Sequence, residues 1–394
     1  MKRILFISHR IPYPPDKGDK IRSFNEIKYL SKNNLLDILT FVDNPKDYQY
    51  ENQLKKYCNK LYIYPIKKLF HGFKAAYFFV IGKTLSEGYY FSRKIQKKVN
   101  ELLSSNNYEL VFCYSSQIAQ YIINKNIPKL IDFCDVDSLK WKQYSERKIF
   151  PYNVLLKIES ERLSRREKEI YHQFSLSLFS TNTEVKIFNP PEDNHIYVLP
   201  NGVDYEYFKP QPIKKENSLI FVGTMNYFAN VDAVLWFSKN VFPKILNKYP
   251  EMKFYIVGRN PESRLIALSE NSENIIVTGY VEDIRPYISR SKLAVIPLRI
   301  ARGIQNKILE AMAMEIPVVM PRNILNTFEN LEESNVLVYD TENSMVDVIV
   351  NSVNDDALLE RVGKKSREYV MHNHDWNVIF HNFNRYFNSK FKTM

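Results

Sequence analysis

The strongest chemical signal in this sequence is a group of polar residues at the start of a predicted helix. The segment ARGIQNKILEAMAMEIPVV places Arg302, Gly303, Lys307 and Glu310 around the beginning of an otherwise apolar run. Gly303 allows close approach to the backbone, and the amides of residues 303–305 would point out of the helix N-terminus, where anions bind. Lys307 adds a point charge, and Arg302 adds a planar fork that suits phosphate. The Glu310 carboxylate does not suit phosphate, but it is a good partner for the hydroxyls of a ribose.

An alternative interpretation makes Lys307 and Glu310 an ion pair on a solvated helix surface. Such a pair would stabilise the helix by only about 0.2–0.5 kcal/mol. The run ILEAMAMEIPVV, which contains Glu310, is too apolar for a fully solvated face. This composition favours a site for phosphate and ribose over a surface pair.

Two series of apolar runs predict the elements that would position this site. Buried strands are expected at 3–8, 36–42, 61–66, 110–115, 130–135 and 176–181, and then at 219–223, 253–258, 275–280, 293–298, 317–320 and 336–339. Helical stretches separate the strands, for example at 22–30 and 154–174. This alternation predicts an α/β protein with two doubly wound parallel sheets, which bind ligands outside the carboxyl ends of their strands.

The chain length of 394 residues fits two domains of ordinary size. The segment 199–218 is rich in Pro, Asn and Lys and predicts a linker. We expect one domain at 1–205 and a second at 206–375, facing each other across a cleft. The amphipathic end of the chain, 376–394, is expected to form a helix that packs back on the first domain.

The composition excludes several classes of protein. Hydrophobic residues make up 45% and charged residues 25%, which is typical of a soluble globular protein. The start of the chain does not read as a signal peptide, and no run approaches the roughly 20 apolar residues that cross a bilayer, so we expect a cytoplasmic protein. The net charge of +11 could attract nucleic acid, anionic lipid or phosphorylated small molecules. Nucleic acid is not expected, because no zinc-finger, homeodomain or RNP-type pattern is present.

Glycine turns follow several strands of the second series. Gly223 lies in FVGTMNYFANVDAVLWF, between a predicted strand and a helix that Asn230 could cap. This is not the GxGxxG pattern of a dinucleotide site. The stretches YIVGRNP and VTGYVEDIRPYI also end strands with glycine. Each turn alone could be plain loop geometry.

Two other groups of polar residues could do chemistry. In DFCDVDSLKW, Asp135 and Asp137 follow a strand end, although Asp137 or Ser138 could instead cap the next helix. His372 and His374 lie near the start of a predicted helix, where capping is expected rather than metal binding.

Aromatic and basic residues interleave over residues 66–99. Such a segment could lie in a membrane interface, with its rings at the level of the headgroups and its lysines on anionic lipid. Alternatively, it could form an ordinary buried helix pair with its lysines on the wet side.

Four stretches together resemble the nucleotide-sugar glycosyltransferases with the GT-B fold: KILEAMAMEIPVV, LPNGVDYEYFKP, FVGTMNYFANVDAVLWF and GYVEDIRPYI. The resemblance is closest to the large retaining family four. Within it, HRIPYPPDKGDKIRSFN and ARGIQNK resemble a group linked to bacterial exopolysaccharide and exosortase gene clusters. The resemblance covers nearly the whole chain and implies a donor site in the C-terminal domain and an acceptor site in the N-terminal domain.

The resemblance assigns roles to the residues with which this section began. Glu310 matches the second glutamate of the family's E-x7-E signature, which binds the nucleotide ribose. Lys307 and the amides of Gly303, Ile304 and Gln305 match the region that faces the diphosphate and the sugar.

The resemblance also implies roles elsewhere in the chain. Arg259 and Val281 match positions that line the base pocket, and Gly223 belongs to the first strand-to-helix turn of the donor domain. Gly18 matches an N-terminal glycine loop close to the donor sugar and its phosphates. The final helix with Trp376 matches the segment that returns to the first domain.

The sequence departs from the family pattern at three places. Arg302 replaces the first glutamate of the signature, and the usual cations after the first strand of the second domain are missing. We therefore predict that Arg302 and Lys307 neutralise the diphosphate, together with Lys17, Lys20 or Arg22 from the first domain. The family's acceptor-facing His near Asp135 is also absent, so Asp135 or Asp137 could position the acceptor hydroxyl. These two residues form a D-x-D pattern like that of the metal-dependent GT-A fold, but the other motifs are of the metal-free type.

We therefore predict a metal-independent, retaining glycosyltransferase of bacterial surface polysaccharide or glycoconjugate synthesis. It would use a UDP- or GDP-linked sugar, need no cofactor, and act on a glycan or lipid-linked acceptor at the inner face of the membrane. Two alternatives are a sugar-nucleotide epimerase of the same fold and a non-catalytic sugar-nucleotide-binding protein.

Overall fold

The computed structural model describes residues 1–146, 148–191, 195–299 and 303–391. The chain divides into two compact units, Met1–Leu199 and Pro200–Met394. Each unit is built on its own parallel sheet. The prediction of two doubly wound parallel-sheet domains is thus confirmed.

Among the described residues of the first unit, seven strands form one sheet in the order β3-β2-β1-β4-β5-β6-β7. Every pairing is parallel. The strands are β1 (Arg3–Ser8), β2 (Leu35–Val42), β3 (Lys60–Pro65), β4 (Leu110–Tyr114), β5 (Lys129–Cys134), β6 (Leu176–Phe179) and β7 (Ile196–Val198). The central strands are almost continuously apolar because helices cover both faces of the sheet. Strand β7, a three-residue edge strand with half-buried side chains, was not predicted from the sequence.

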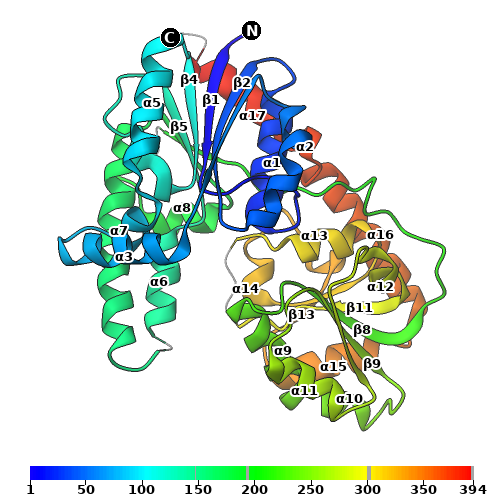
Figure 1. Cartoon of the computed structure of the whole chain (residues 1–394). Helices are drawn as coiled ribbons and strands as arrows, with labels where there is room; N and C mark the ends of the chain where they lie inside the picture. The colour runs from blue at the N-terminus through cyan, green and yellow to red at the C-terminus, as the bar shows by residue number, and fades with distance from the viewer. Residues whose placement is uncertain (147, 192–194, 300–302, 392–394) are drawn as a thin grey trace. The chain divides into compact units, whose positions relative to one another are not determined.

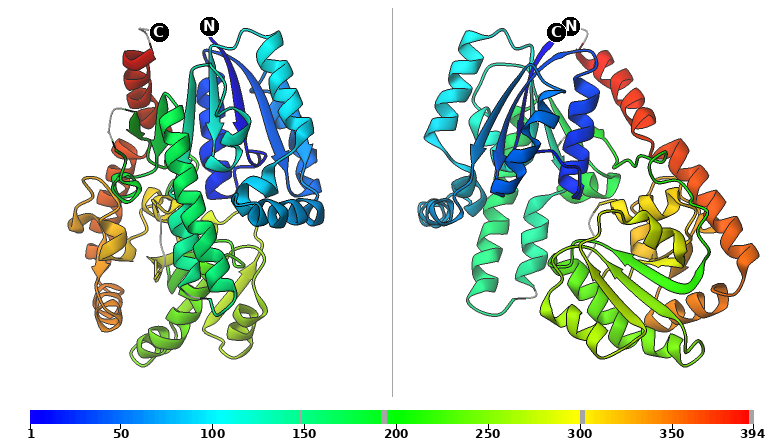
Figure 2. Two further views of the ribbon diagram at one scale, coloured as in Figure 1. Left: turned by 90° about the vertical axis from the view of Figure 1, so that its left-hand side faces the viewer. Right: turned by 45° about the vertical axis from the view of Figure 1, so that its right-hand side comes forward.

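The helices of this unit are α1 (Gly18–Leu30), η1 (Pro45–Tyr50), α2 (Glu51–Lys55), α3 (Lys68–Val80), α4 (Leu85–Tyr90), α5 (Arg93–Ser105), η2 (Ser116–Tyr121), α6 (Asp137–Ser145), α7 (Tyr152–Gln173) and α8 (Asn182–Phe188). Figures 1 and 2 show α1 and α5 on opposite faces of the sheet. The interior face of α5 is apolar at Ile95, Val99 and Leu102, which recur at helical spacing and are buried.

A fully buried ion pair ties α1 to the centre of the first sheet. Arg22 donates from Nε and Nη2 to the two carboxylate oxygens of Asp132 on β5, at 2.5 and 3.1 Å. Its Nη1 donates to the carbonyl of Leu199 at 2.7 Å. The neighbouring carboxyl of Glu26 is also buried. Its burial and the nearby charge of Asp132 raise the pKa of Glu26 well above the ordinary value. The arrangement fixes α1, and with it the loop that precedes Gly18, on the sheet.

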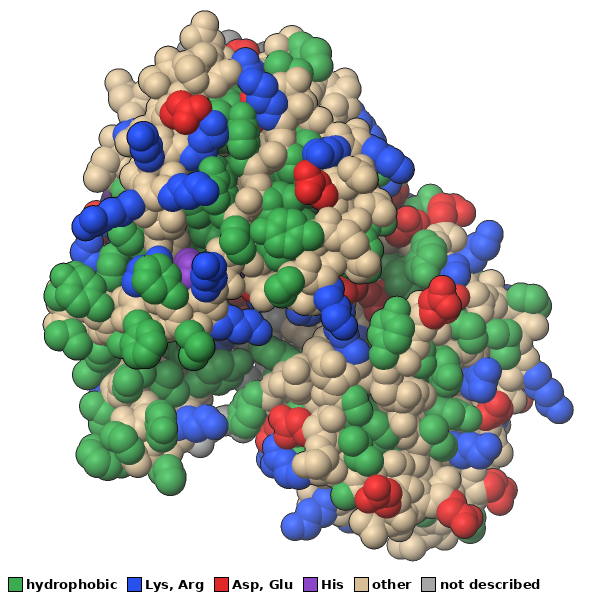
Figure 3. Space-filling model, in the orientation of Figure 1, with side chains coloured by type: hydrophobic (Ala, Val, Ile, Leu, Met, Phe, Trp, Pro, Cys, Tyr) green, Lys and Arg blue, Asp and Glu red, His purple; other side chains and the backbone are tan. Residues whose placement is uncertain are grey.

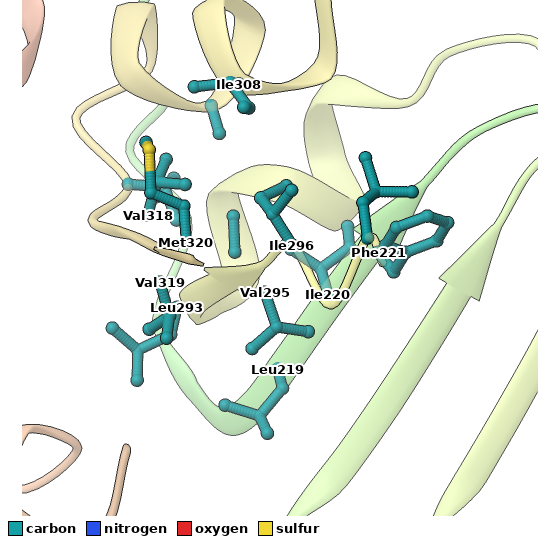
Figure 4. Packing of buried hydrophobic residues seen from close by; sticks show 14 of the residues in the cluster. Leu219, Ile220, Phe221, Leu293, Val295, Ile296, Ile308, Val318, Val319 and Met320 are labelled. Atoms are coloured by element: carbon teal, nitrogen blue, oxygen red, sulfur yellow. The ribbon is translucent and has the colours of Figure 1, made fainter. Parts of the chain in front are cut away.

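Six strands form the sheet in the described part of the second unit, in the order β10-β9-β8-β11-β12-β13. They are β8 (Glu216–Val222), β9 (Lys253–Val257), β10 (Ile275–Gly279), β11 (Ser291–Val295), β12 (Val318–Pro321) and β13 (Leu337–Tyr339). All pairings are parallel. Figure 4 shows Ile308 of helix α13 (Asn306–Ala313) above the apolar side chains of β8, β11 and β12. This packing places the start of α13 next to the sheet.

The remaining helices of the second unit are α9 (Phe228–Asn240), α10 (Phe242–Leu246), α11 (Ser263–Glu270), α12 (Arg285–Arg290), α14 (Arg322–Leu325), η3 (Glu333–Asn335), α15 (Glu342–Ser352), α16 (Asp356–Asn373) and α17 (Trp376–Phe391). Helix α17 begins at Trp376, where the sequence predicts that the last helix starts. His374 ends α16 and lies buried, so it does not begin a helix as predicted.

His374 holds the segment that joins the two units. Its Nδ1 is 2.8 Å from the carbonyl of Asn201, and Val203 forms a bridge with Asp375. Burial lowers the pKa of His374 to about 4, so the ring is neutral at physiological pH and its Nδ1–H can donate to that carbonyl. The first part of the predicted linker is thus pinned to the second unit. The prediction that the final helix packs back on the first domain stays a prediction.

Candidate functional site

The turns that end β8 and β9 are packed against each other at the carboxyl edge of the second sheet. The amide of Gly223 donates to the carbonyl of Val257 at 3.0 Å, and the amide of Met225 donates to the carbonyl of Arg259 at 2.9 Å. Gly258 has a φ of +148°, and a Cβ built on it would lie 1.7 Å from the carbonyl oxygen of Gly223. Only glycine fits this crossing, which holds the two turns together.

Lys307 reaches this crossing from α13. Its Nζ donates to Oδ1 of Asn230 at 2.7 Å and lies 4.0 Å from the ring centroid of Phe221, the second-last residue of β8. A Cβ on Gly223 would lie 3.2 Å from the same Nζ. Nδ2 of Asn230 donates to the carbonyl of Thr224 at 3.0 Å. The structure therefore brings Gly223 and Lys307 together, with Asn230 as the residue that orients the ammonium.

Asn230 was expected to cap the helix after β8, and this expectation is wrong. The residue before α9 is Tyr227, and Asn230 lies within the first turn of the helix. Its side chain turns toward the strand end because its amide bridges Thr224 and Lys307. One feature of the sequence hinted that Asn230 has a role at the strand end: residues 224–230, which follow β8, contain no Lys or Arg but include this Asn.

Lys307 and Glu310 are both half-buried, one helical turn apart, so they do not form a solvated surface pair. Burial lowers the pKa of Lys307 to about 7, although the charge of Glu310 opposes this shift. Burial also raises the pKa of Glu310 to about 7, and Lys307 opposes that shift. Both groups thus titrate near neutral pH. Such shifts are common where side chains are held ready for a ligand.

The segment before α13 has the geometry of a candidate anion site. Gly303 adopts a left-handed φ of +56°, and α13 begins after Gln305, whose side chain makes no capping hydrogen bond to the helix. The carbonyl of Ile304 accepts a hydrogen bond from Asn201 Nδ2 at 2.9 Å, which fixes the approach to the helix. Arg302 lies outside the described residues.

Two further predicted donor residues lie along the same sheet edge. Arg259 is half-buried and directly follows the crossing at Gly258, whose amide donates to the carbonyl of Gly279 at 3.2 Å. Val281 comes two residues after Gly279 and packs, partly buried, against the core of the second unit. The hydrogen bonds between turns thus connect the ends of β8, β9 and β10, where these residues lie.

Gly18 is exposed and begins α1 in the first unit. A Cβ built on it would have no atom within 4 Å. Its neighbour Asp19 accepts a hydrogen bond from Arg10 at 2.5 Å, and His9 Nε2 is 3.6 Å from the same carboxylate. Burial would raise the pKa of Asp19, but the hydrogen bond from His9 and the charge of Arg10 outweigh it and hold that pKa well below the usual range. The ring of His9 stacks on Tyr114 with centroids 5.8 Å apart.

His9 and Asp19 form a His–Asp pair that the sequence analysis did not identify. The family's acceptor-facing histidine would lie near Asp135, which follows β5. His9 follows β1 instead, which is the strand next to β4 at the centre of the sheet. A histidine directly after a buried central strand was the signal that could have shown it.

Asp135 and Asp137 flank the start of α6 and are already engaged by protein groups. Asp135 Oδ1 accepts from the hydroxyl of Ser180 at 2.7 Å, and Asp137 Oδ1 accepts from Lys140 Nζ at 2.5 Å. Neither Asp137 nor Ser138 caps α6, because the capping position is held by Val136. The alternative of a capping residue here is therefore wrong, and the role of both aspartates toward an acceptor stays a prediction.

Two buried glutamates from other helices take up the first amides of α6. Glu184 Oε2 accepts from the amide of Val136 at 2.7 Å, and Glu167 accepts from both the amide and the hydroxyl of Ser138, at 3.1 and 2.5 Å. The first backbone amides of a helix have no partner within the helix, and these carboxyl groups accept their hydrogen bonds. The sequence did not reveal these contacts because both partners lie far from α6 in the chain.

We expect Glu167→Gln to change how stability depends on pH. Burial raises the pKa of Glu167 from 4.5 to about 8, so the folded state holds its proton in a range where the unfolded chain has lost it. The stability that this proton confers is complete below the unfolded pKa and is lost as the pH rises through about 8. Between these two pKa values, the wild type should therefore lose up to about 1.4 kcal/mol of unfolding free energy per pH unit relative to the variant.

Urea denaturation at a series of pH values measures this difference. Glu169→Gln is the matched control, because Glu169 lies on the same helix but is exposed and pairs with Arg166. Parallel pH profiles for the wild type and Glu167→Gln would contradict the assignment.

The described residues contain no group of three or more His, Cys, Asp or Glu side chains that could hold a metal ion.

Residues 216–355, which include Gly223, Lys307 and Glu310, match the family model described as "Glycosyl transferases group 1". Sucrose-phosphate synthase from Thermosynechococcus elongatus superposes on this chain with a TM-score of 0.74 at 15% identity, covering 100% of each chain. The fold is GT-B.

Two further similarities cover almost the whole chain. A structure of HepE from Anabaena in complex with UDP and glucose shares the GT-B fold, with a TM-score of 0.67 at 12% identity over 99% of this chain and 100% of that chain. The "Uncharacterized 44.6 kDa protein in cps region" of Klebsiella pneumoniae is 19% identical over 404 residues, which covers 96% of this chain and 98% of that protein.

Proposed function

We propose that this protein is a glycosyltransferase that moves a sugar from a nucleoside-diphosphate sugar to a glycan or lipid-linked acceptor. The observation that carries the proposal is the half-buried Lys307, held by Asn230 and Phe221 at the crossing of two glycine turns. This geometry lies inside the segment that matches the glycosyl transferases group 1 model. The similarity to a protein from a cps region supports a role in surface polysaccharide synthesis.

Lys307 and the start of α13 would bind the diphosphate of the donor. An ammonium group has three N–H donors, so its hydrogen bond to Asn230 leaves it able to bind an anion as well. The backbone amides and dipole of α13 add positive potential at the same end of the helix. As the glycosidic bond breaks, negative charge grows on the leaving diphosphate, and fixed positive groups stabilise that charge.

Glu310 would bind the ribose of the donor, and Arg259 and Val281 would border the base. The pKa of Glu310, about 7, makes its carboxylate available to ribose hydroxyls at and above neutral pH. UDP is the first nucleotide to test, because the similar HepE structure contains UDP and glucose. We include GDP as the other proposed donor nucleotide.

Transfer would proceed with retention and without a metal ion. In a retaining reaction the leaving phosphate itself can accept the proton of the acceptor hydroxyl. Asp135 and Asp137 are proposed to orient the acceptor, and their engagement with Ser180 and Lys140 fits positioning better than joint metal binding. Activity should then persist in EDTA.

Incubation of the protein with a panel of UDP-, GDP- and dTDP-sugars tests the function. We expect one donor to release its nucleoside diphosphate, with faster release when a glycan or lipid-linked acceptor is added. Interconversion of the nucleotide sugar without release would indicate an epimerase. Binding with neither reaction would indicate a non-catalytic sugar-nucleotide-binding protein.

Glu310→Gln is expected to weaken binding of the nucleoside diphosphate by about tenfold to a hundredfold, because a hydrogen bond to a charged group contributes about 1.5–3 kcal/mol. The amide keeps the shape of the side chain but loses its charge. Isothermal titration with the active nucleotide measures the change. Glu315→Gln is the control, since Glu315 follows α13 rather than lying within it. Equal affinities of wild type and Glu310→Gln would remove Glu310 from the site.

A further inference from the structure

Helix α3 carries an outward face of large apolar side chains. Phe73 is 77% exposed and Tyr77 is 63% exposed, although both are aromatic residues that are usually buried in part. The exposed residues recur at spacings of three and four, so they share one side of the helix. The members of this outward face are Leu69, Phe70, Phe73, Tyr77, Val80 and the adjoining Ile81.

The opposite side of α3 is also apolar, and it accounts for the packing of the helix. His71, Ala75 and Phe78 are buried, and the ring of His71 is hydrogen-bonded to the carbonyl of Tyr89. A surface helix of a globular protein normally has a polar outer face. The alternative in which lysines cover the wet side of a buried helix pair therefore does not describe α3.

A second exposed apolar cluster lies where α6 and α7 meet. Its members are Ile149, Phe150, Tyr152, Val154 and Leu155. Figure 3 shows hydrophobic side chains gathered over α3 and over this tip on the same face of the first unit.

Helix α7 connects the two clusters rigidly. Arg162 of α7 donates from Nη1 to the carbonyls of Phe79 and Lys83, at 2.5 and 3.0 Å, and its guanidinium lies 4.5 Å from the ring centroid of Phe79. Arg166 of the same helix pairs with Glu87 of α4 at 2.8 Å. The α3–α4 hairpin is thus fixed to the helix whose first turn carries the second cluster.

The charged residues in and next to α3 are all basic. No Asp or Glu occurs from residue 67 to residue 86. Lys67, Lys68 and Lys83 are exposed at the two ends of the helix, next to the apolar face. Exposed aromatic side chains flanked by lysines suit a surface with an apolar layer beneath anionic groups.

We infer that α3 and the α6–α7 tip form a docking surface for an anionic lipid bilayer. The apolar side chains of both clusters enter the boundary between headgroups and acyl chains, and the lysines lie against lipid phosphates. None of the described helices has the length and apolarity to span a bilayer, so the inferred contact is an interfacial one. The inference goes beyond the proposed function and does not depend on any nucleotide or sugar.

The positive charge of this docking surface favours contact with an anionic bilayer over contact with a second copy of this chain. A symmetric contact places the same surface of each copy against the other. Lysines of one copy would then face lysines of its partner, which opposes association. A bilayer with anionic headgroups instead gains about 1 kcal/mol for each lysine near its surface.

Flotation of the full chain with vesicles tests the inference. The wild type is expected to float with vesicles of phosphatidylglycerol and phosphatidylcholine, less so at high salt, and hardly at all with phosphatidylcholine alone. The triple variant Phe70→Ser/Phe73→Ser/Tyr77→Ser is expected to bind the anionic vesicles about a hundredfold more weakly, since each buried aromatic side chain contributes strongly to insertion.

The control variant is Ile187→Ser/Ile266→Ser, which removes exposed apolar side chains from α8 and α11 and should float like the wild type. Sedimentation velocity without vesicles tests the alternative that a second copy of this chain covers the surface. We expect the wild type and the triple variant to sediment alike. A wild type that does not float, or a triple variant that floats equally well, would overturn the inference. So would a wild-type dimer that the triple variant converts to a monomer without a change in flotation. Because no nucleotide is present, failure here leaves the proposed transferase function untouched.

Discussion

Replacing Lys307 by methionine is expected to lower the rate of sugar transfer by about a hundredfold to a thousandfold. Methionine has a similar length and no charge, so it removes the ammonium without opening a large cavity. The loss is expected because Lys307 is half-buried beside Gly223, where we propose that its ammonium group binds the diphosphate. A fixed charge at such a site stabilises the leaving group more strongly than an exposed charge does. Steady-state kinetics with the active donor measures the effect.

The control for this variant is Lys244→Met. Lys244 belongs to the same unit, but it forms an exposed ion pair with Glu342. Exposed pairs contribute little to stability, so this variant should keep its fold and its rate. Circular dichroism checks that Lys307→Met is folded, which we expect because methionine relieves the cost of burying a charge. Normal turnover by folded Lys307→Met would show that the diphosphate is bound elsewhere.

The substitution Gly258→Ala is expected to unfold the second unit at a much lower temperature. The new Cβ would lie 1.7 Å from the carbonyl oxygen of Gly223, so the crossing of two backbone turns must open. A backbone shift of this kind costs about 4 kcal/mol or more. For a unit of this size each kcal/mol lowers Tm by about 2–4 °C, so differential scanning calorimetry should show a fall of about 10 °C.

Gly279→Ala separates this clash from the cost of a left-handed backbone. Gly279 has a φ of +68°, but a Cβ there meets no atom within 4 Å. It should therefore cost only about 1 kcal/mol. If Gly258→Ala and Gly279→Ala lowered Tm equally, the crossing would not be the reason for glycine at position 258.

Apolar runs in the sequence predicted the strands of both sheets well, because the strands of a parallel sheet are buried on both faces. The predicted strand at 3–8 coincides with β1, and the one at 253–258 differs from β9 by its last residue. Strand β7 was not predicted because its apolar run is short and leads directly into the predicted linker at residue 199. The contact between His374 and Asn201 was not predicted, because it joins two segments that lie far apart in the chain.

The residues of the candidate site were predictable where local sequence determines their position. Gly303, Lys307 and Glu310 share one turn and the start of one helix, and the structure describes them there. Asn230 was not assigned to Lys307, because their contact joins the first turn of α9 to α13. The pairs that involve His9 and Glu167 likewise join residues from separate elements. Periodicity reveals which residues face a sheet, but not which distant partner each one meets.

We propose that the second unit binds a nucleoside diphosphate through Lys307. Thermal unfolding with UDP, GDP and dTDP, each compared with its nucleoside, measures this binding, because a ligand of the native state raises Tm. We expect one diphosphate to raise the Tm of the wild type by several degrees, its nucleoside to have a much smaller effect, and Lys307→Met to abolish the difference. A panel without any shift, or an equal shift for Lys307→Met and the wild type, would contradict it.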